Sequence, residues 1–178
     1  MLTLHTKLPS AERIDARLVL PYELREKCRL RATLDSGETV GVFTVRGTVL
    51  RDGDLLTGAD RRVVQVVAAP EATYRVSCRD AHALLRCAYH LGNRHTQVQL
   101  GEGFLRIRAD AVLKDMLAGL GATVEEELSP FEPEAGAYGG GHHHHGEHAH
   151  AGAPGPLAPI PLRQKIHRPS DPAPDAAP

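Results

Sequence analysis

The stretch TYRVSCRDAHALLRCAYHLGNRHTQVQLGEGFLRIRADAVLKDMLAGLGATVEEEL at residues 73–128 decides the fold of this chain. Its first six residues alternate between apolar and polar side chains, which is the period of a half-buried β-strand. Asp80, a preferred N-cap residue type, then precedes apolar residues at helical spacing as far as about Leu91. Gly92 and Asn93 follow, and these residue types commonly end helices. The stretch therefore begins with a strand and a helix.

Similar patterns continue to the end of this stretch. Residues 97–100 and 104–108 have strand patterns on either side of the glycine-containing residues 101–103, which suits a hairpin turn. Asp110 then precedes a second helical pattern, and a final strand is predicted at 123–128. The resulting order is βαββαβ, which is typical of a ferredoxin-like domain.

Each predicted helix has one apolar stripe that we expect to face the sheet. The stripe of the first helix comprises Ala81, Leu84, Leu85, Ala88 and Leu91. The stripe of the second helix comprises Val112, Leu113, Met116, Leu117 and Leu120.

The strand patterns in residues 1–71 predict a small all-β domain. Residues 28–34 and 38–45 have strand patterns separated by an Asp-Ser-Gly turn sequence, so we expect them to form a hairpin. A further strand is predicted at 62–68, and Pro70 is expected to end the pattern.

Three regions therefore make up the predicted organisation, and the fold class is α+β. They are the all-β domain of residues 1–71, the ferredoxin-like domain of residues 72–137 and a tail of residues 138–178. Residues 138–178 are rich in histidine and then in proline, with eight of the 13 prolines after residue 150. Such a composition cannot bury enough apolar surface to offset its ordering entropy, so we expect a disordered tail.

The composition excludes several classes of function. A net charge of −1 argues against broad electrostatic binding of nucleic acid, which requires a basic surface. The sequence has no apolar run of about 20 residues, the length that a membrane span requires, and its first residues do not resemble a signal peptide. Three cysteines without close pairing do not form a disulfide framework, so we expect a cytoplasmic protein. Common catalytic motifs are missing, and we expect no enzyme activity.

A dense histidine cluster is the most unusual feature of the sequence. Neutral imidazole is a good ligand for nickel, copper and zinc, and the surrounding glycine and alanine residues would let several rings reach one ion. An expression tag or a neutral spacer is the alternative interpretation, but the cluster is internal and is interrupted by other residues. The predicted metal ligands in the cluster are His142, His143, His144, His145, His148 and His150.

His95 is a second candidate ligand because it follows the end of the first predicted helix. A single histidine at such a position is more often a capping or packing residue, and one imidazole cannot complete a coordination shell. It becomes a plausible anchor if a two-fold dimer brings two copies together.

A structural zinc site is a rival interpretation of the same region. It would use Cys78, Cys87, His90 and His95, but the spacing of the two cysteines is unlike that of a Cys-x-x-Cys knuckle. We therefore favour buried, apolar roles for these cysteines.

Several stretches together resemble the urease accessory protein E family. They are VGVFTVRGTVLRDGDLL at 40–56, AYHLGNRH at 88–95, VLKDML at 112–117 and PFEPEAGAY at 130–138, followed by a histidine-rich tail. The GNRH and PFEPEAGAY segments, in this order and spacing, are the most specific part of the resemblance.

The resemblance implies a cytoplasmic nickel metallochaperone that delivers Ni(II) for assembly of the urease active site. It implies that the all-β domain binds a partner or peptide and that the ferredoxin-like domain binds metal and forms a homodimer, in which His95 of each subunit meets at the interface. The implied partners include an accessory GTPase and apo-urease. Two departures stand out: residues 106–111 lack the histidines of some relatives, and Thr96-Gln97 replaces a common Val-Pro.

Two other functions stay open at this point. The chain could store or buffer nickel or zinc through its tail, with Zn(II) or Cu(II) also binding in vitro. Alternatively, it could be an interaction scaffold whose β domain binds a protein partner and whose histidines are incidental.

Overall fold

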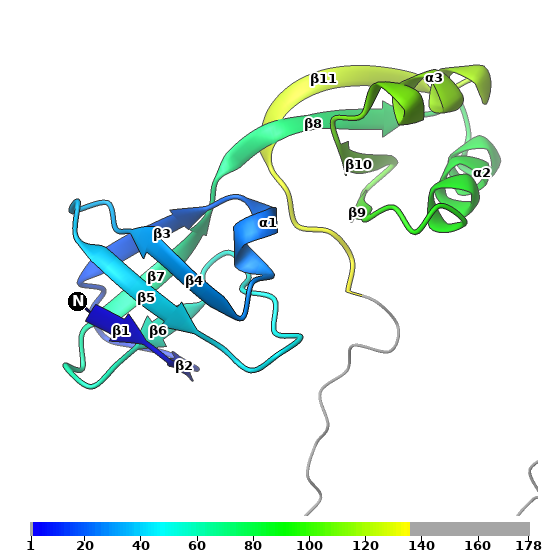
Figure 1. The fold of residues 1–178 in the computed structure, drawn as a ribbon. Coiled ribbons are helices and arrows are strands. Elements are labelled where there is room, and N and C mark those ends of the chain that lie inside the picture. Colours follow the sequence, from blue (N-terminus) through cyan, green and yellow to red (C-terminus); the bar gives the residue numbers. More distant parts are fainter. Residues whose placement is uncertain (1, 136–178) are drawn as a thin grey trace, which may run out of the picture. The chain divides into compact units, whose positions relative to one another are not determined.

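The computed structural model describes residues 2–135, which form eleven strands and three helices. The first part of the chain contains most of the strands and one short helix (Figure 1). These elements are β1 (Leu2–Leu4), β2 (Thr6–Leu8), β3 (Ala16–Leu20), α1 (Tyr22–Arg25), β4 (Arg29–Thr33), β5 (Thr39–Phe43), β6 (Leu55–Thr57) and β7 (Val63–Ala68). The later elements are β8 (Pro70–Ser77), α2 (Ala81–Gly92), β9 (Gln99–Gly101), β10 (Phe104–Arg108), α3 (Ala111–Gly119) and β11 (Thr123–Pro130).

Strands β1 to β7 form two sheets with the orders β1-β5-β4 and β2-β6-β7-β3. The β4–β5 hairpin confirms the sequence prediction, with Leu30 opposite Val42 and a positive φ of 85° at Gly37 in the turn. Strand β7 also lies where a strand was predicted. The pairings of β1 with β5 and of β3 with β7 are parallel and join segments far apart in the sequence.

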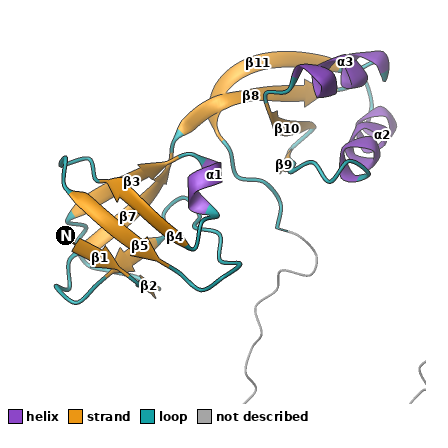
Figure 2. Ribbon diagram, viewed as in Figure 1, coloured by secondary structure: helices purple, strands orange, loops and turns teal. Residues whose placement is uncertain are grey.

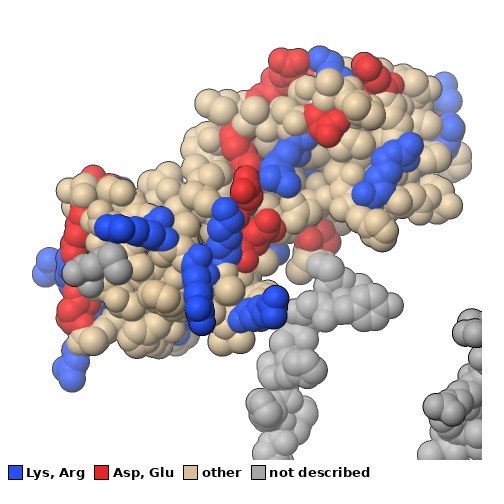
Figure 3. Space-filling model, in the orientation of Figure 1, with Lys and Arg blue, Asp and Glu red and all other residues tan. Residues whose placement is uncertain are grey.

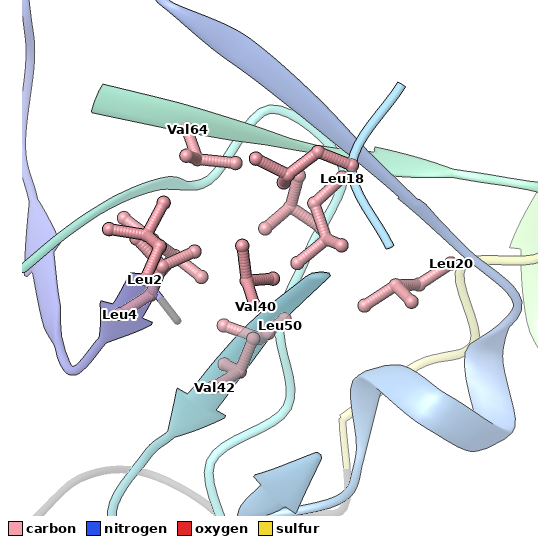
Figure 4. Packing of buried hydrophobic residues seen from close by; sticks show 11 residues of the cluster. Leu2, Leu4, Leu18, Leu20, Val40, Val42, Leu50 and Val64 are labelled. Carbon is pink, nitrogen blue, oxygen red and sulfur yellow. The ribbon is translucent and has the colours of Figure 1, made fainter. Parts of the chain in front are cut away.

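The two sheets enclose a core of leucine and valine side chains (Figure 4). Alternate residues of each strand contribute to it, as in β7, where Val64 and Val66 point inward. Leu4, Leu18 and Val40 are also fully buried in this cluster. The period-2 pattern in the sequence therefore corresponds to one buried face per strand.

The third sheet has the order β11-β8-β10-β9, and all of its pairings are antiparallel. Its elements follow the predicted βαββαβ order, so the α+β class is confirmed. Figure 2 shows the two longer helices, α2 and α3, beside this sheet. Helix and strand side chains share one buried cluster that includes Val76, Leu91, Ile107 and Leu117.

Strand β7 ends at Ala68, so the pattern breaks before Pro70 as expected, but Pro70 itself continues the β structure. It is the first residue of β8 and lies opposite Pro130, the last residue of β11. The first position of a strand tolerates proline, which lacks the N–H donor. Strands β8 and β11 therefore run beside each other over eight residues, longer than either prediction (Figure 1).

Most of each predicted apolar stripe packs in the buried cluster, but one large member of each stripe stays exposed. In α2 the fully buried residues are Cys87 and Leu91, whereas the exposed fraction of Leu85 is 68%. In α3 Leu117 is buried, whereas Val112 has an exposed fraction of 77%. Cysteine is small and apolar enough to occupy the helix–sheet contact, so Cys87 joins Leu84, Ala88 and Leu91 there.

The segment after β11 is anchored by the fully buried side chain of Arg25. Its Nε donates to the carbonyl of Leu20 at 3.2 Å, and its Nη1 donates to the carbonyl of Leu50 at 3.1 Å. Its Nη2 donates to the carbonyl of Phe131 at 2.5 Å, and Nη1 also pairs with the carboxylate of Glu132. We call this arrangement the Arg25 clasp.

The aromatic ring of Phe131 and a second arginine complete the Arg25 clasp. Phe131 is fully buried, with its ring edge-on to Tyr22 and a centroid distance of 5.5 Å. Arg51 Nη1 donates to Glu132 Oε2 at 3.2 Å and to the carbonyl of Pro133 at 2.8 Å. Four backbone carbonyls and one carboxylate thus receive hydrogen bonds from two guanidinium groups.

Charged side chains of both signs lie on the face of the molecule shown in Figure 3. Within residues 2–135, no helix is both long and apolar enough to cross a bilayer.

Candidate metal centre

The candidate ligand His95 lies just beyond helix α2, which is capped at its start and buried in the core near its end. At the start of the helix, the carboxylate of Asp80 accepts a hydrogen bond from the N–H of Ala83 at 2.8 Å. This hydrogen bond and the neighbouring Arg79 lower the pKa of Asp80. Near the end of the helix, Leu91 is fully buried in the cluster beneath it. The helix therefore delivers the residues after Gly92 to a fixed place.

The chain leaves α2 through two backbone hydrogen bonds that form a Schellman motif. The N–H of Thr96 donates to the carbonyl of Leu91 at 3.1 Å, and the N–H of His95 donates to the carbonyl of Gly92 at 2.9 Å. This motif requires a left-handed residue at the position of His95, and His95 has a φ of 54°. The sequence correctly predicts the helix end, but the left-handed residue is the histidine and not Gly92 or Asn93.

A histidine at this position costs free energy of folding. Glycine is the usual residue there, and a side chain in the left-handed region costs about 1–2 kcal/mol. The residue is exposed, so its ring is not held there by packing in a core. Strain without a packing benefit favours a functional role for the side chain. The imidazole can donate a nitrogen lone pair to a borderline metal ion such as Ni(II).

His95 lines a polar cleft of about 640 Å³. Gln97 lies in this cleft and bridges its walls, because its amide Nε2 donates to Glu26 at 3.3 Å and its Oε1 accepts from Arg108 at 3.3 Å. Gln97 therefore supplies a side-chain bridge, and strand β9 begins two residues later at Gln99.

The rival zinc site is not assembled. Cys87 is buried against the sheet with its sulfur 3.8 Å from that of Cys78. The ring of His90 instead packs edge-on to the ring of Tyr89, with a centroid distance of 5.4 Å. No group of three or more His, Cys, Asp or Glu side chains within the described part of the chain is arranged to hold a metal ion.

The remaining predicted ligands lie outside the described residues, and their metal binding stays a prediction. They are His142, His143, His144, His145, His148 and His150.

Two family models match the chain in succession. The model described as the UreE urease accessory protein, N-terminal domain, matches residues 2–69, and the model of the C-terminal domain matches residues 71–153.

The chain belongs to the UreE urease accessory protein family.

Full-length UreE relatives agree with this assignment. The chain is 68% identical over 172 residues to the urease accessory protein UreE of Nitrosospira multiformis, covering 96% of this chain and 98% of the relative. It is 70% identical over 173 residues to the UreE of Janthinobacterium sp. (strain Marseille), covering 97% and 99%. The UreE of Cupriavidus necator is 55% identical over 138 residues, covering 78% and 72%.

The two segments most specific to the UreE resemblance have different structural roles. GNRH, residues 92–95, forms the Schellman end of α2 and exposes a histidine. PFEPE, residues 130–134, is buried at Phe131 and belongs to the Arg25 clasp. Sequence reasoning missed Arg25, since a single arginine beside Glu and Lys looks like a solvated surface residue.

Proposed function

We propose that this UreE family member binds Ni(II) and delivers it during assembly of the urease active site. The observation that carries the proposal is His95, an exposed imidazole placed in a strained left-handed position at the end of a well-anchored helix. The relatives' name, urease accessory protein UreE, supports urease as the destination. The role is transfer of an ion, with no catalysed reaction.

A homodimer would give His95 a partner ligand. An isologous interface places each residue near its symmetry copy, so His95 of the partner subunit would supply a second fixed imidazole. Leu85 and Tyr89, one turn apart on α2, support a dimer through this domain because their exposed fractions are 68% and 66%. Burial of these two side chains against a second copy would remove their apolar surface from water.

The histidine-rich tail would load the anchored site. Histidines tethered to the same chain act at high effective concentration, so they would capture an ion and pass it to His95. Imidazole ligands without thiolate bind Ni(II) in an open shell from which a partner can take the ion. The proposed partners are an accessory GTPase and the apo-urease complex, and the proposed location is the cytoplasm.

Titration calorimetry with Ni(II) at about pH 7.5 tests the proposal. Four proteins are compared: the full chain, a chain ending at Tyr138, His95→Ala and His82→Ala. We expect one tight nickel site per dimer in the full chain, in the shortened chain and in His82→Ala, and loss of that site in His95→Ala. His82 is the matched control because it is an exposed histidine on the same helix.

Urease activation in a reconstituted assay gives a second readout. If Ni(II) is delivered through His95, His95→Ala should reduce urease activation and His82→Ala should leave it unchanged. Unchanged nickel affinity, stoichiometry and urease activation in His95→Ala would disprove the anchoring role.

Nickel or zinc storage in the tail is the second candidate function. The six histidines between positions 142 and 150 favour it. For storage alone, the chain ending at Tyr138 would lose nearly all binding and His95→Ala would bind normally.

A further inference from the structure

Two cysteines lie beside each other in the core under helix α2. Cys78 directly follows strand β8, and Cys87 lies in the second turn of α2. Their sulfur atoms are 3.8 Å apart, and both residues belong to the hydrophobic cluster between the helices and the sheet. Both thiols are free. The proposed nickel site uses neither.

We propose that Cys78 and Cys87 form an oxidisable dithiol that closes to a reversible disulfide between the end of β8 and helix α2. A disulfide bond is about 2.05 Å long, so the sulfurs must approach by less than 2 Å. Rotation about the side-chain torsions and a small shift of the helix suffice for this movement. Oxidation would fix α2 covalently to the sheet on which it packs.

The two thiols differ in their access to an oxidant. Cys78 is partly exposed, whereas Cys87 is fully buried. Burial, followed by the hydrogen bond with Cys78, raises the pKa of the Cys87 thiol to about 11. Since thiolate is the reactive form and requires access to the reagent, Cys78 reacts first and Cys87 resolves the product.

A peroxide is the chemical class of oxidant that balances the reaction. The Cys78 sulfur attacks one peroxide oxygen, an S–O bond forms, the O–O bond breaks, and hydroxide leaves and takes the thiol proton as water. The Cys87 sulfur then attacks the Cys78 sulfur, the S–S bond forms and the S–O bond breaks. The second hydroxide leaves with the Cys87 proton as water. The two thiols are oxidised by two electrons, and the peroxide is reduced to two waters.

The third cysteine provides an internal control. Cys28 lies just before β4, outside the cluster that contains the pair, and it is partly exposed like Cys78. Exposure alone would therefore oxidise Cys28 and Cys78 similarly. Proximity predicts instead that only Cys78 and Cys87 become linked.

Peptide mapping of the full-length protein after hydrogen peroxide treatment tests the proposal. The protein is unfolded, its remaining thiols are alkylated, and it is digested with trypsin. Cleavage after arginine places Cys78 in the peptide 76–79 and Cys87 in 87–94, and cleavage after Lys27 and Arg29 places Cys28 in 28–29. We expect a linked pair of peptides 76–79 and 87–94 that is about 2 Da lighter than the sum of its parts, and dithiothreitol should separate it.

Variants separate the linkage from general oxidation. Cys28→Ser should form the same linked peptides as the wild type. In Cys78→Ser, Cys87 should stay fully alkylatable after peroxide treatment, because the partner that links to it is gone. The linked peptide in the wild type needs no variant to fold, so the proposal stays testable if Cys78→Ser is unstable. Absence of the 76–79 to 87–94 link, or linkage through Cys28 instead, would overturn it.

Discussion

The backbone N–H of His95 donates to the carbonyl of Gly92 at 2.9 Å, and this bond holds His95 in the left-handed region with a φ of 54°. The same turn that ends helix α2 therefore presents the candidate metal ligand to solvent. His95 therefore has two roles: its backbone ends helix α2, and its side chain is the candidate metal ligand. Different substitutions of His95 can test the two roles separately.

Replacement of His95 by glycine should give a more stable protein than replacement by alanine, whereas both replacements should remove the tight nickel site. Glycine adopts a positive φ without steric cost, whereas alanine keeps the left-handed penalty. We expect His95→Gly to be more stable than His95→Ala by about 0.5–1 kcal/mol in urea unfolding, after allowance for the greater unfolded-state entropy of glycine. Both variants should lose the tight nickel site in calorimetry. Retention of that site in either variant would contradict the proposed ligand.

Leu85→Glu should separate the proposed dimer into monomers. Leu85 is the more exposed of the two large apolar side chains on α2, and a charge there would be buried without a partner in the interface. We expect a monomer by light scattering and at least about a tenfold loss of nickel affinity, because the second imidazole is removed. Val45→Glu is the control, since Val45 is exposed but lies after β5. A dimeric Leu85→Glu protein would place the interface elsewhere.

Arg25→Met should destabilise the chain strongly. The substitution removes the guanidinium donor from the carbonyls of Leu20, Leu50 and Phe131, although Leu20 keeps the N–H of Ala69 as a donor. It also leaves Glu132 with one of its two arginines. Loss of one partner of a buried charged network typically costs about 3–5 kcal/mol, which urea unfolding measures. Glu132→Gln is the milder comparison, because that side chain is partly exposed and the amide oxygen still accepts a hydrogen bond. Equal losses in the two variants would argue against the guanidinium as the centre of the Arg25 clasp.

Arg62→Gln should change how stability depends on pH. Arg62 donates to both carboxylate oxygens of Glu38, at 2.7 and 2.8 Å, and to Asp60 at 2.6 Å, and these hydrogen bonds lower the pKa of each carboxyl. Carboxyls with a lowered folded-state pKa stabilise the protein above their ordinary pKa values of about 4, and that stabilisation is lost as the pH falls through the lowered values.

In Arg62→Gln we expect both pKa values to rise toward their ordinary range in an NMR titration. The free energy of unfolding should then vary less between pH 5 and pH 3 than in the wild type. Unchanged carboxyl titration in the variant would show that Arg62 does not hold these groups in solution.

The order of strands and helices around the β11-β8-β10-β9 sheet was predictable because each of these elements has a local signal. Asp80 and Asp110 accept the N-cap hydrogen bonds that the sequence predicts, from Ala83 and Leu113. Gly103 has a φ of 75° in the predicted hairpin turn. Strong periodicity and capping chemistry are local properties, so they can be recognised without the tertiary structure.

The missed elements depend on contacts between distant residues. Strands β1 and β2 have only three residues each, too few for a period, and β1 exists through its parallel pairing with β5. Leu85 belongs to the predicted stripe of α2 but is exposed, because periodicity defines a stripe and not which of its members meet the sheet. The left-handed conformation of His95 results from a six-residue hydrogen-bonded turn, and no residue type in GNRH identifies the histidine as the residue that adopts it.

The Arg25 clasp has a consequence for the order in which the chain folds during translation. Glu132 is 107 residues downstream of Arg25, which corresponds to roughly 5–20 s of synthesis. During this interval strands β1 to β7 can assemble, while the guanidinium of Arg25 lacks its partners at Phe131 and Glu132. The nascent β fold therefore stays incompletely satisfied until the strand β11 region leaves the ribosome. A chain that stalls before residue 131 would be a preferred substrate for chaperones and proteases.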